Sequence, residues 1–508
     1  MNFTIILLII LTLISRIVGM AREMAIAYFY GATAVGDAYF VSLAIPTVIM
    51  TCLTFSLATS YVPVYQKLPA NKADKHLFTN KAIGITLLIG LLTLIVAQIF
   101  APQLVRLFAV GFDENTMRIT TMLTRITLFA VFLMGINHLL QGLMQVKEKV
   151  LLASLSGLPF NFVATIFIII SAYTNLPMLA IGTVVALGAQ SLYLLTLAHR
   201  QQFRLKPQLD FKDSNVQNLI VLSLPIILAN TVDQLGLVVD KNIASTFGTG
   251  AISALTYATR TTTAISAVFV TSILVMTFPK IARLVATNNL MQMKEALSQA
   301  IVGMNLFVIP VIATVAMFSY PLTSLLFGRG AFDDSAVLTT SNLLFFLAFF
   351  LFGSGMFALV ARVFYALGDS KTPMIVATVK VIINLFLNVV LTALMGISGL
   401  ALATSISSLV GMVILIVLLR RKIGSLRLKN TLISLNKITG ASLVMVVFAY
   451  FFYHFIAEFH ELLALFVAAI AGSGLYLLLI LILRIKEVEQ LVALAISKVR
   501  TFVKKKKL

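Results

Sequence analysis

The stretch NFTIILLIILTLISRIVGMAREMAIAYFY, residues 2–30, decides the class of this protein. It is long and apolar enough to cross a bilayer as one helix, yet it contains Arg16 and Arg22. A charged side chain near the middle of a lipid-facing helix costs at least ~2.5–3.5 kcal/mol. The two arginines therefore predict a wet, polar cavity between helices. Because guanidinium groups bind phosphate oxygens, the stretch indicates a carrier of an anionic, phosphate-bearing molecule.

The composition places the chain among membrane proteins. Of its 508 residues, 60% are hydrophobic and only 11% are charged, which soluble domains do not show. The apolar segments are continuous runs of helical length, whereas an outer-membrane barrel needs short alternating strands. We therefore predict an all-α polytopic membrane protein with about fourteen transmembrane helices. The expected spans lie near residues 3–30, 37–65, 82–108, 117–144, 150–172, 177–198, 216–240, 250–279, 296–326, 336–363, 373–395, 398–419, 438–455 and 462–483.

Lysine and arginine gather in alternate connections between these spans, for example 66–81, 199–212 and 420–437. By the positive-inside rule this side is cytoplasmic, which places both termini in the cytoplasm. The charges flank spans instead of forming one patch, which favours anionic membrane lipids over nucleic acid as partners. The basic tail 486–508 is expected to lie as an amphipathic helix on the inner leaflet, or to serve only topology and solubility.

The sequence does not contain the residue patterns that catalysis needs. A single cysteine, Cys52, excludes an internal disulfide and a multi-cysteine metal site. No Walker A, kinase or nucleophile-elbow motif occurs. We expect a transporter that is not an enzyme, binds no cofactor, and draws on an ion gradient or the membrane potential.

The chain repeats itself at a spacing of about 217 residues. Gly31–Val35 is echoed by residues 248–252, and Tyr61–Pro63 by Thr277–Pro279. Six spans in each copy give both copies the same orientation, so a parallel repeat is predicted, with the substrate at its interface. The predicted domains are an N-terminal six-helix lobe (1–210), a C-terminal six-helix lobe (211–420), an extra helix pair (421–485) and the tail (486–508).

Ionisable residues inside spans are the first functional candidates. Arg16 and Arg22 in the first half and Arg260 in the second could converge on one diphosphate, since each guanidinium binds phosphate in a bidentate manner. The alternative is that they cap helix ends or snorkel to headgroups. Asp37 would orient an arginine, cap a helix or touch the substrate.

Oxygen-bearing side chains form a second group of candidates. Asp233 and Asp240 share one helix face, as do Asn384 and Asn388, and Thr404 follows in the next span. Such oxygens suit Na⁺, a hard cation. They also suit hydrogen bonds between membrane helices, and the residues by themselves favour these hydrogen bonds over a Na⁺ site.

Several motifs resemble those of one known family. SRIVGMARE at residues 15–23 is similar to the first-helix motif of the MurJ/MviN lipid II flippases, within the multidrug/oligosaccharidyl-lipid/polysaccharide exporter superfamily. Further similar stretches are GDAYFV (36–41), YVP (61–63), YATR (257–260) and RVFYALGDSKTP (362–373). The family has fourteen helices in two lobes and an extra pair, as expected above.

The resemblance implies that Arg16, Arg22 and Arg260, with Ser15 and Asp37, bind the pyrophosphate of an undecaprenyl-linked sugar. It further implies translocation of lipid II from the inner to the outer leaflet by alternating access. The extra helix pair would provide a groove for the lipid tail. A sodium site known in some members carries over to Asp240, Asn384, Asn388, Leu400 (through its carbonyl) and Thr404.

The sequence departs from the family pattern at three places. Residues 49–54 lack an arginine pair and a glutamate, Thr261–Thr263 replace an expected acidic residue, and Asn388 stands where an aspartate is found. The alternatives are therefore a flippase for another lipid-linked glycan, of exopolysaccharide or teichuronic type, a cation-coupled multidrug antiporter, and a non-transporting scaffold. We expect a monomer that has cell-wall synthesis proteins among its partners.

Overall fold

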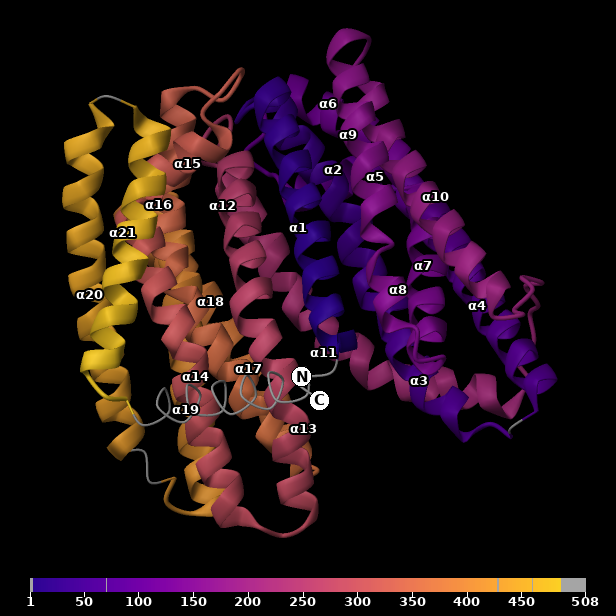
Figure 1. Cartoon of the computed structure of the whole chain (residues 1–508). Helices are drawn as coiled ribbons and strands as arrows, with labels where there is room; N and C mark the ends of the chain where they lie inside the picture. The colour runs from indigo at the N-terminus through magenta and orange to yellow at the C-terminus, as the bar shows by residue number, and fades with distance from the viewer. Residues whose placement is uncertain (1–2, 70, 427–428, 459, 486–508) are drawn as a thin grey trace, which may run out of the picture. The chain divides into compact units, whose positions relative to one another are not determined.

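The computed structural model describes residues 3–69, 71–426, 429–458 and 460–485, and this part of the chain consists of helices joined by short turns (Figure 1). The predicted amphipathic tail, 486–508, lies outside the described residues. The helices, including two short π-helical turns labelled η, are α1 Phe3–Tyr30, α2 Ala34–Met50, η1 Thr51–Phe55, α3 Ser56–Lys67, α4 Lys72–Ile99, α5 Ala101–Phe108, α6 Glu114–Thr127, α7 Ala130–Val146, α8 Val150–Ser154, α9 Gly157–Tyr173, α10 Pro177–Arg200, α11 Ser214–Ser245, α12 Ala251–Ser266, η2 Ala267–Thr271, α13 Ser272–Ala286, α14 Leu290–Met317, α15 Ser319–Phe327, α16 Asp334–Ala348, α17 Phe350–Ala366, α18 Lys371–Met395, α19 Ser398–Ile423, α20 Lys429–Ala457 and α21 Glu461–Ile482.

The predicted all-α membrane class is confirmed. In the described part of the chain, 11 helices are long and apolar enough to cross a membrane, or 12 if α6 and α7, bent by 47°, form one span. The predicted count of fourteen is not confirmed. Neither α1 nor the continuous run α12–η2–α13 belongs to the 11, although both have the length of a span.

Several helices begin at side chains that cap them. Asp113 accepts hydrogen bonds from the backbone of Asn115 and Thr116 at the start of α6, and Asp213 does the same for α11. Thr33, Asn71 and Asn289 cap α2, α4 and α14. These oxygens satisfy backbone N–H groups that have no partner within the helix.

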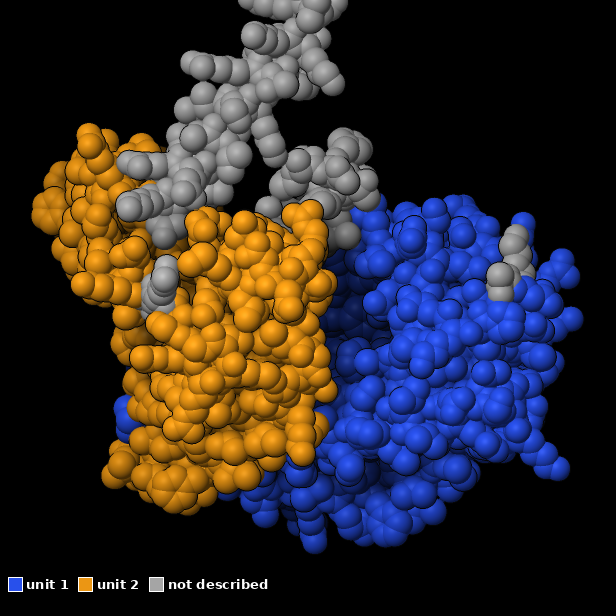
Figure 2. Space-filling model, turned by 90° about the horizontal axis from the view of Figure 1, so that it is seen from below, with its two compact units in different colours: residues 1–257, 326–340, 395–400 blue, residues 258–325, 341–394, 401–508 orange. Residues whose placement is uncertain are grey.

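The described chain divides into two compact units, coloured in Figure 2. Unit 1 comprises residues 1–257, 326–340 and 395–400, and unit 2 comprises 258–325, 341–394 and 401–508. The border therefore cuts through α12, so that α12 begins in unit 1 and ends in unit 2. The compact units are defined by contacts and not by sequence repetition, so they do not test the two repeat lobes predicted at 1–210 and 211–420.

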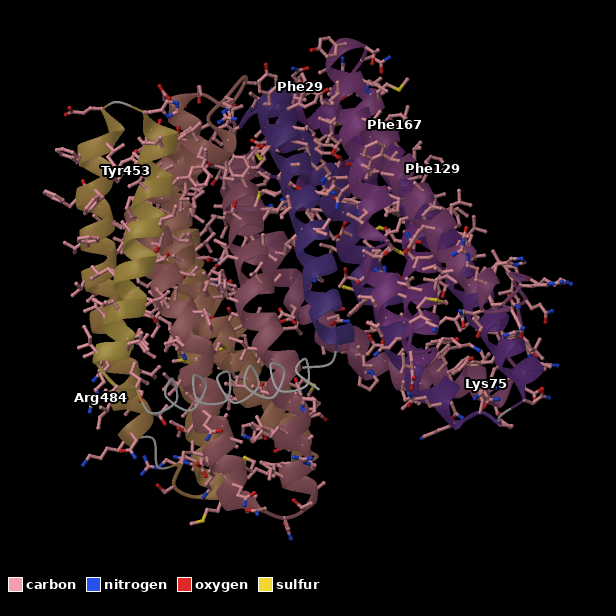
Figure 3. The ribbon with its side chains drawn as sticks, viewed as in Figure 1. Phe29, Lys75, Phe129, Phe167, Tyr453 and Arg484 are labelled. Atoms are coloured by element: carbon pink, nitrogen blue, oxygen red, sulfur yellow. The ribbon has the colours of Figure 1, made fainter. Side chains whose placement is uncertain are left out.

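Unit 1 contains close contacts between segments far apart in the sequence. The Ala331 N–H donates to the carbonyl of Tyr28 over 2.8 Å, and a Cβ on Gly31 would lie 2.1 Å from the Ala331 oxygen. Within the helical part, α9 and α10 lie side by side, with Phe167, labelled in Figure 3, so close to Gly182 that a Cβ there would be 2.1 Å away. Glycine at such positions allows backbones to approach closely in a membrane.

Unit 2 contains its own core, in which α14, α20 and α21 pack together. The hydroxyl of Tyr476 in α21 donates to the carbonyl of Leu306 in α14 over 2.7 Å. Ala449 of α20 lies against Gly472 of α21, where an added Cβ would come within 3.0 Å. The predicted extra helix pair is thus a packed pair, and it is attached to α14.

A charged cluster ties α4 to the segment that precedes α11. The ammonium of Lys81, 8% exposed, lies 2.8 Å from Asp210 and 2.6 Å from Asp213. The neighbouring Asn80 side chain donates to the Arg204 carbonyl and accepts from the Lys206 N–H. The hydrogen bond from Lys81 lowers the pKa of Asp210 below its ordinary value, together with backbone hydrogen bonds.

We expect Lys81→Ala to lower the free energy of unfolding, because it leaves the carboxylates of Asp210 and Asp213 without their cation. Thermal unfolding in detergent measures the loss, and Lys67→Ala, at an exposed position, is the control. The folded-state pKa of Asp210 is depressed, so its stabilisation is complete above about pH 4 and disappears as the pH falls through the folded pKa. The difference in the free energy of unfolding between wild type and Lys81→Ala should therefore become smaller at acidic pH. An equal loss in both lysine variants would contradict the structural role of Lys81.

Candidate functional site

One face of α1 lies on α9, and it contains two of the predicted site residues. Ser15, Gly19 and Arg22 share this face, because seven residues make almost two full turns. A Cβ on Gly157 of α9 would lie 3.0 Å from the Ser15 hydroxyl, and a Cβ on Gly19 would lie 3.5 Å from the Asn161 amide. Each glycine thus leaves room for a polar side chain of the other helix, so that α1 and α9 can approach closely.

Arg22 is held in place from two sides. It forms an ion pair with Glu23, and its guanidinium lies over the Phe160 ring, 5.1 Å from the ring centroid. The Arg22 side chain is 17% exposed and that of Glu23 is 5% exposed. A partly desolvated cation–π contact contributes about 1–2 kcal/mol. In addition, the Nε atom of Arg22 is buried and finds no hydrogen-bond acceptor among the described residues.

Glu23 is a site residue that the sequence analysis missed. It is 4% exposed and lies inside the first span, where a lone carboxylate would be as costly as a lone arginine. The available signal was its position directly after Arg22. Pairing with Glu23 offsets the cost of burying Arg22 and reduces the net positive charge at this point of the site.

Arg16 does not share the face of Arg22. Six residues turn an α-helix by about 600°, so the two side chains leave α1 some 120° apart. Arg16 is exposed, whereas Arg22 is half-buried. Arg260 is half-buried on α12 in unit 2. Ser15 and Arg22 therefore share one face of α1, almost two turns apart, within unit 1, and the convergence of all three arginines stays a prediction.

Asp37 caps α12 although it belongs to another helix, α2. Its side chain is buried, and its two oxygens accept from the Gly250 N–H at 2.7 Å and from the N–H and hydroxyl of Ser253, both at 2.6 Å. A carboxylate there complements the positive end of the helix dipole. Of the roles considered for Asp37, helix capping is the one seen here, and its direct contact with substrate stays a prediction. The cap fixes the start of the helix that carries Arg260.

The five residues of the predicted sodium site are divided between the units. Asp240 and Leu400 lie in unit 1, whereas Asn384, Asn388 and Thr404 lie in unit 2. In unit 2 the Asn384 amide donates to the Thr404 hydroxyl and the Asn388 amide donates to Asn384, both over 3.4 Å. The first of these bonds joins α18 to α19, as the hydrogen-bonding alternative expected, and the second lies within α18. No group of three or more His, Cys, Asp or Glu that could hold a metal occurs among the described residues.

We expect Asp37→Asn to lower the free energy of unfolding by about 1–2 kcal/mol, the range measured for helix caps, because the amide replaces a charge-assisted cap by a neutral one. Thermal unfolding in detergent is the measurement. Glu458→Gln, which neutralises an exposed carboxylate, is the matched control and should leave the melting temperature unchanged. Equal melting temperatures for Asp37→Asn and wild type would rule out a stabilising cap.

Comparison with known proteins adds a family to this geometry. The family model described as "Lipid II flippase MurJ" matches residues 26–470. A "Probable lipid II flippase MurJ" from Rickettsia prowazekii is 25% identical over 410 residues, covering 79% of this chain and 80% of the relative.

Solved structures share the fold. "Lipid II flippase MurJ, inward closed conformation" superposes with a TM-score of 0.80 at 24% identity, covering 93% of this chain and 98% of the other. An inward-facing multidrug resistance MATE transporter of the MOP superfamily reaches a TM-score of 0.66 at 14% identity, covering 82% and 96%. The family match extends over most of the chain and contains the residues that place Asp37, Arg260 and α18–α19. This membrane protein belongs to the MurJ family of lipid II flippases.

Proposed function

We propose that this protein translocates lipid II, the undecaprenyl-pyrophosphate-linked peptidoglycan precursor, from the inner to the outer leaflet by alternating access. The observation that carries the proposal is Arg22. It is a half-buried guanidinium inside a membrane protein of this family, it is oriented by Glu23 and Phe160, and it has an unsatisfied buried N–H. A buried donor without an acceptor costs about 1–3 kcal/mol, and a phosphate oxygen would recover that cost.

The arrangement around Arg22 suits a diphosphate headgroup. The guanidinium offers five donors in a rigid plane, and the contacts with Glu23 and Phe160 leave part of this fork for bidentate bonds to phosphate. Ser15 on the same helix face adds a hydroxyl donor. The Glu23 carboxylate repels a phosphate that does not contact Arg22, so the phosphate has to be placed directly against the guanidinium.

The extra helix pair supports the proposal from the side of the lipid tail. A cavity of about 240 Å³ lies between α14, α15, α20 and α21 in unit 2. Its walls include Phe318, Leu322, Met445 and Gly472, together with Phe466, which is 67% exposed at the outer surface of α21. An apolar cavity in a membrane-spanning region excludes water and suits a hydrocarbon chain. We assign it to a section of the substrate's polyprenyl tail.

The membrane potential suits the direction of transport. With both termini cytoplasmic, the substrate enters from the negative side of the membrane. Each negative charge of its pyrophosphate that moves outward then gains about 2.3 kcal/mol per 100 mV. The basic connections hold anionic lipids on the cytoplasmic face, and cell-wall synthesis enzymes would consume the exported precursor.

A flippase for another lipid-linked glycan is the second candidate. It is supported by residues 49–54, which carry no charge in a family whose members often have arginines and a glutamate there. A multidrug antiporter would need buried carboxylates that can take a cation. Glu23 is engaged with Arg22, and Asp37 is engaged with the start of α12, so both disfavour this function.

The candidate Na⁺ ligands in unit 2 are Asn384, Asn388 and Thr404. They are neutral and hydrogen-bonded to one another, which disfavours sodium coupling in this chain. We expect Asn388→Asp to add the missing negative charge and to create or strengthen sodium binding. The measurement is the melting temperature in NaCl compared with KCl at equal ionic strength. The sodium-dependent rise should be larger in Asn388→Asp than in wild type, and Thr404→Ala in that background should abolish it. If Na⁺ stabilises neither protein, α18 and α19 are joined by hydrogen bonds only.

We expect Arg22→Ala to reduce lipid II translocation in proteoliposomes by about 10–100-fold, as the loss of one to two charge-assisted hydrogen bonds predicts. Arg22→Lys should recover little, because a lysine keeps the charge but not the planar fork. Arg118→Ala, at an exposed arginine, is the control. Rescue of a flippase-depleted bacterium gives a second readout. The function as a lipid II flippase is excluded if wild type fails to rescue, or if Arg22→Ala rescues fully; translocation of a different undecaprenyl-linked glycan by wild type would then support the second candidate.

A further inference from the structure

Two π-helical turns occur at matching places in the repeat. η1 begins at residue 51 and η2 at residue 267, 216 positions apart, and each interrupts the second span of its half. Their sequences, TCLTF and AVFVT, share no residue at equivalent positions and contain no proline or glycine. Nevertheless the exposure pattern is the same, with three half-buried residues, one buried residue and one exposed residue. π-Helical turns are rare and concentrate at functional sites, so a matched pair requires an explanation.

A glycine lies against the buried residue of each turn. A Cβ on Gly135 of α7 would come within 3.5 Å of Thr54 and 2.5 Å of Thr86 of α4. A Cβ on Gly355 of α17 would come within 3.1 Å of Val270 and 3.3 Å of Met304 of α14. Both turns therefore have a glycine on one side. A Cβ on Gly355 would press directly on Val270 of η2, whereas a Cβ on Gly135 would clash with Thr86 of α4 and only touch Thr54 of η1.

Polar side chains tie the first turn to its surroundings. Thr54 lies 3.0 Å from both the Met50 carbonyl and the Nδ1 atom of His138 on α7. Because the hydroxyl has one proton and donates it to the carbonyl, Nδ1 of His138 is the donor to Thr54. One residue beyond the turn, the Asn230 amide of α11 donates to the Ser56 hydroxyl over 2.9 Å. Three helices are thus joined by hydrogen bonds at η1.

The second turn has an apolar residue at the key position. Val270 replaces Thr54, and its neighbours Met304 and Gly355 offer no strong hydrogen-bonding side chain. Packing alone holds Val270 in this place. Hence η2 is the easier of the two turns to deform.

A π turn arises when one extra residue is inserted into a turn of an α-helix, so that the hydrogen bonds there run from i to i+5. If it moves along the helix or reverts to α, the part of the helix on one side rotates by about 100° per residue of slip relative to the other. Arg260 lies seven positions before η2 on the same continuous helix. A slip at η2 would therefore change the direction in which Arg260 points relative to α13.

We propose that η1 and η2 are paired flexing points of the transport cycle, in which η2 yields and η1 is the more firmly held. Each lets the first part of its span, α2 or α12, rotate and tilt against the second part, α3 or α13. The glycines at 135 and 355 provide the space for this movement. The inference does not depend on the identity of the substrate.

Distances between spin labels across each turn test the proposal. Thr47 and Lys67 flank η1, and the equivalent Thr263 and Arg283 flank η2; all four are exposed. Cysteine pairs at these positions are made in a Cys52→Ala background, labelled, and measured by double electron–electron resonance in nanodiscs. The control pair is Leu77 and Val96, two exposed positions on α4, which contains no π turn.

Three samples of each pair are compared: the protein alone, the protein with purified lipid II, and the protein with Asp37→Asn, which weakens the cap of α12. We expect the distance across η2 to change by about 3 Å or more, from the swing of a side chain on a helix of ~5 Å radius, with a smaller change across η1 and none in α4. A response to Asp37→Asn but not to lipid II would support the flexing points and count against lipid II as substrate. Unchanged distances across both turns in all samples would overturn the proposal.

Filling the space beside η2 provides a second test. Gly355→Ala places a methyl group against Val270 and should abolish the distance change across η2. Gly355→Ala combined with Val270→Ala removes the clashing methyl groups and should restore at least half of it. The melting temperature of Gly355→Ala shows whether this variant folds. If it does not fold, the double variant, in which the clash is removed, is compared with wild type instead. A full distance change in Gly355→Ala alone would show that this space is not needed and would overturn the role of the glycine.

Discussion

Burying charge in a membrane is the constraint on which this structure depends. A guanidinium or carboxylate among lipid chains is tolerated only with partners, and each buried charged group of unit 1 described above has them. Arg22 is paired with Glu23 and lies over Phe160, Asp37 accepts three hydrogen bonds at the start of α12, and Lys81 binds two aspartates. The partners come from the next residue, from neighbouring helices and from distant segments. Each of these buried charges is thus paired, and Arg22 keeps one buried N–H without an acceptor among the described residues.

Glycine has a complementary role in this chain. Gly19 and Gly157 let α1 and α9 approach closely enough for Ser15 and Asn161 to face the partner helix. Gly250, with φ of +86°, brings the start of α12 so near Ala32 that a Cβ would be 2.2 Å from its carbonyl oxygen, and this approach puts Asp37 within reach of the helix N-terminus. The approach of α1 to α9 at Ser15 and the cap formed by Asp37 therefore rest on positions that have no side chain.

The two π turns share a geometry without sharing residues. Thr54 and Val270 occupy equivalent buried positions, yet one is bonded to His138 and the other only packs. The same backbone shape arises because each turn lies between helices of equivalent arrangement, with a glycine in the same place. The same backbone shape can thus be stabilised to different degrees at two places in one chain. A transporter that alternates between states needs some elements that deform more easily than others.

The sequence by itself determined the membrane class, the helical architecture and the family, because apolar runs of about 20 residues permit little else in a bilayer. It also singled out Arg22 as a candidate, since an arginine within such a run demands a reason, and the binding of substrate by Arg22 stays a prediction. It overlooked Glu23, because a carboxylate beside an arginine was read as part of a motif and not as its counter-charge. Only the tertiary structure decided that Asp37 caps a helix more than two hundred residues away, that Asn384 bonds Thr404, and that Lys81 meets Asp210 and Asp213. Hydropathy and motifs depend on residues near one another in the chain, whereas these three contacts depend on which distant group lies within hydrogen-bonding distance of a polar atom, and packing determines that distance.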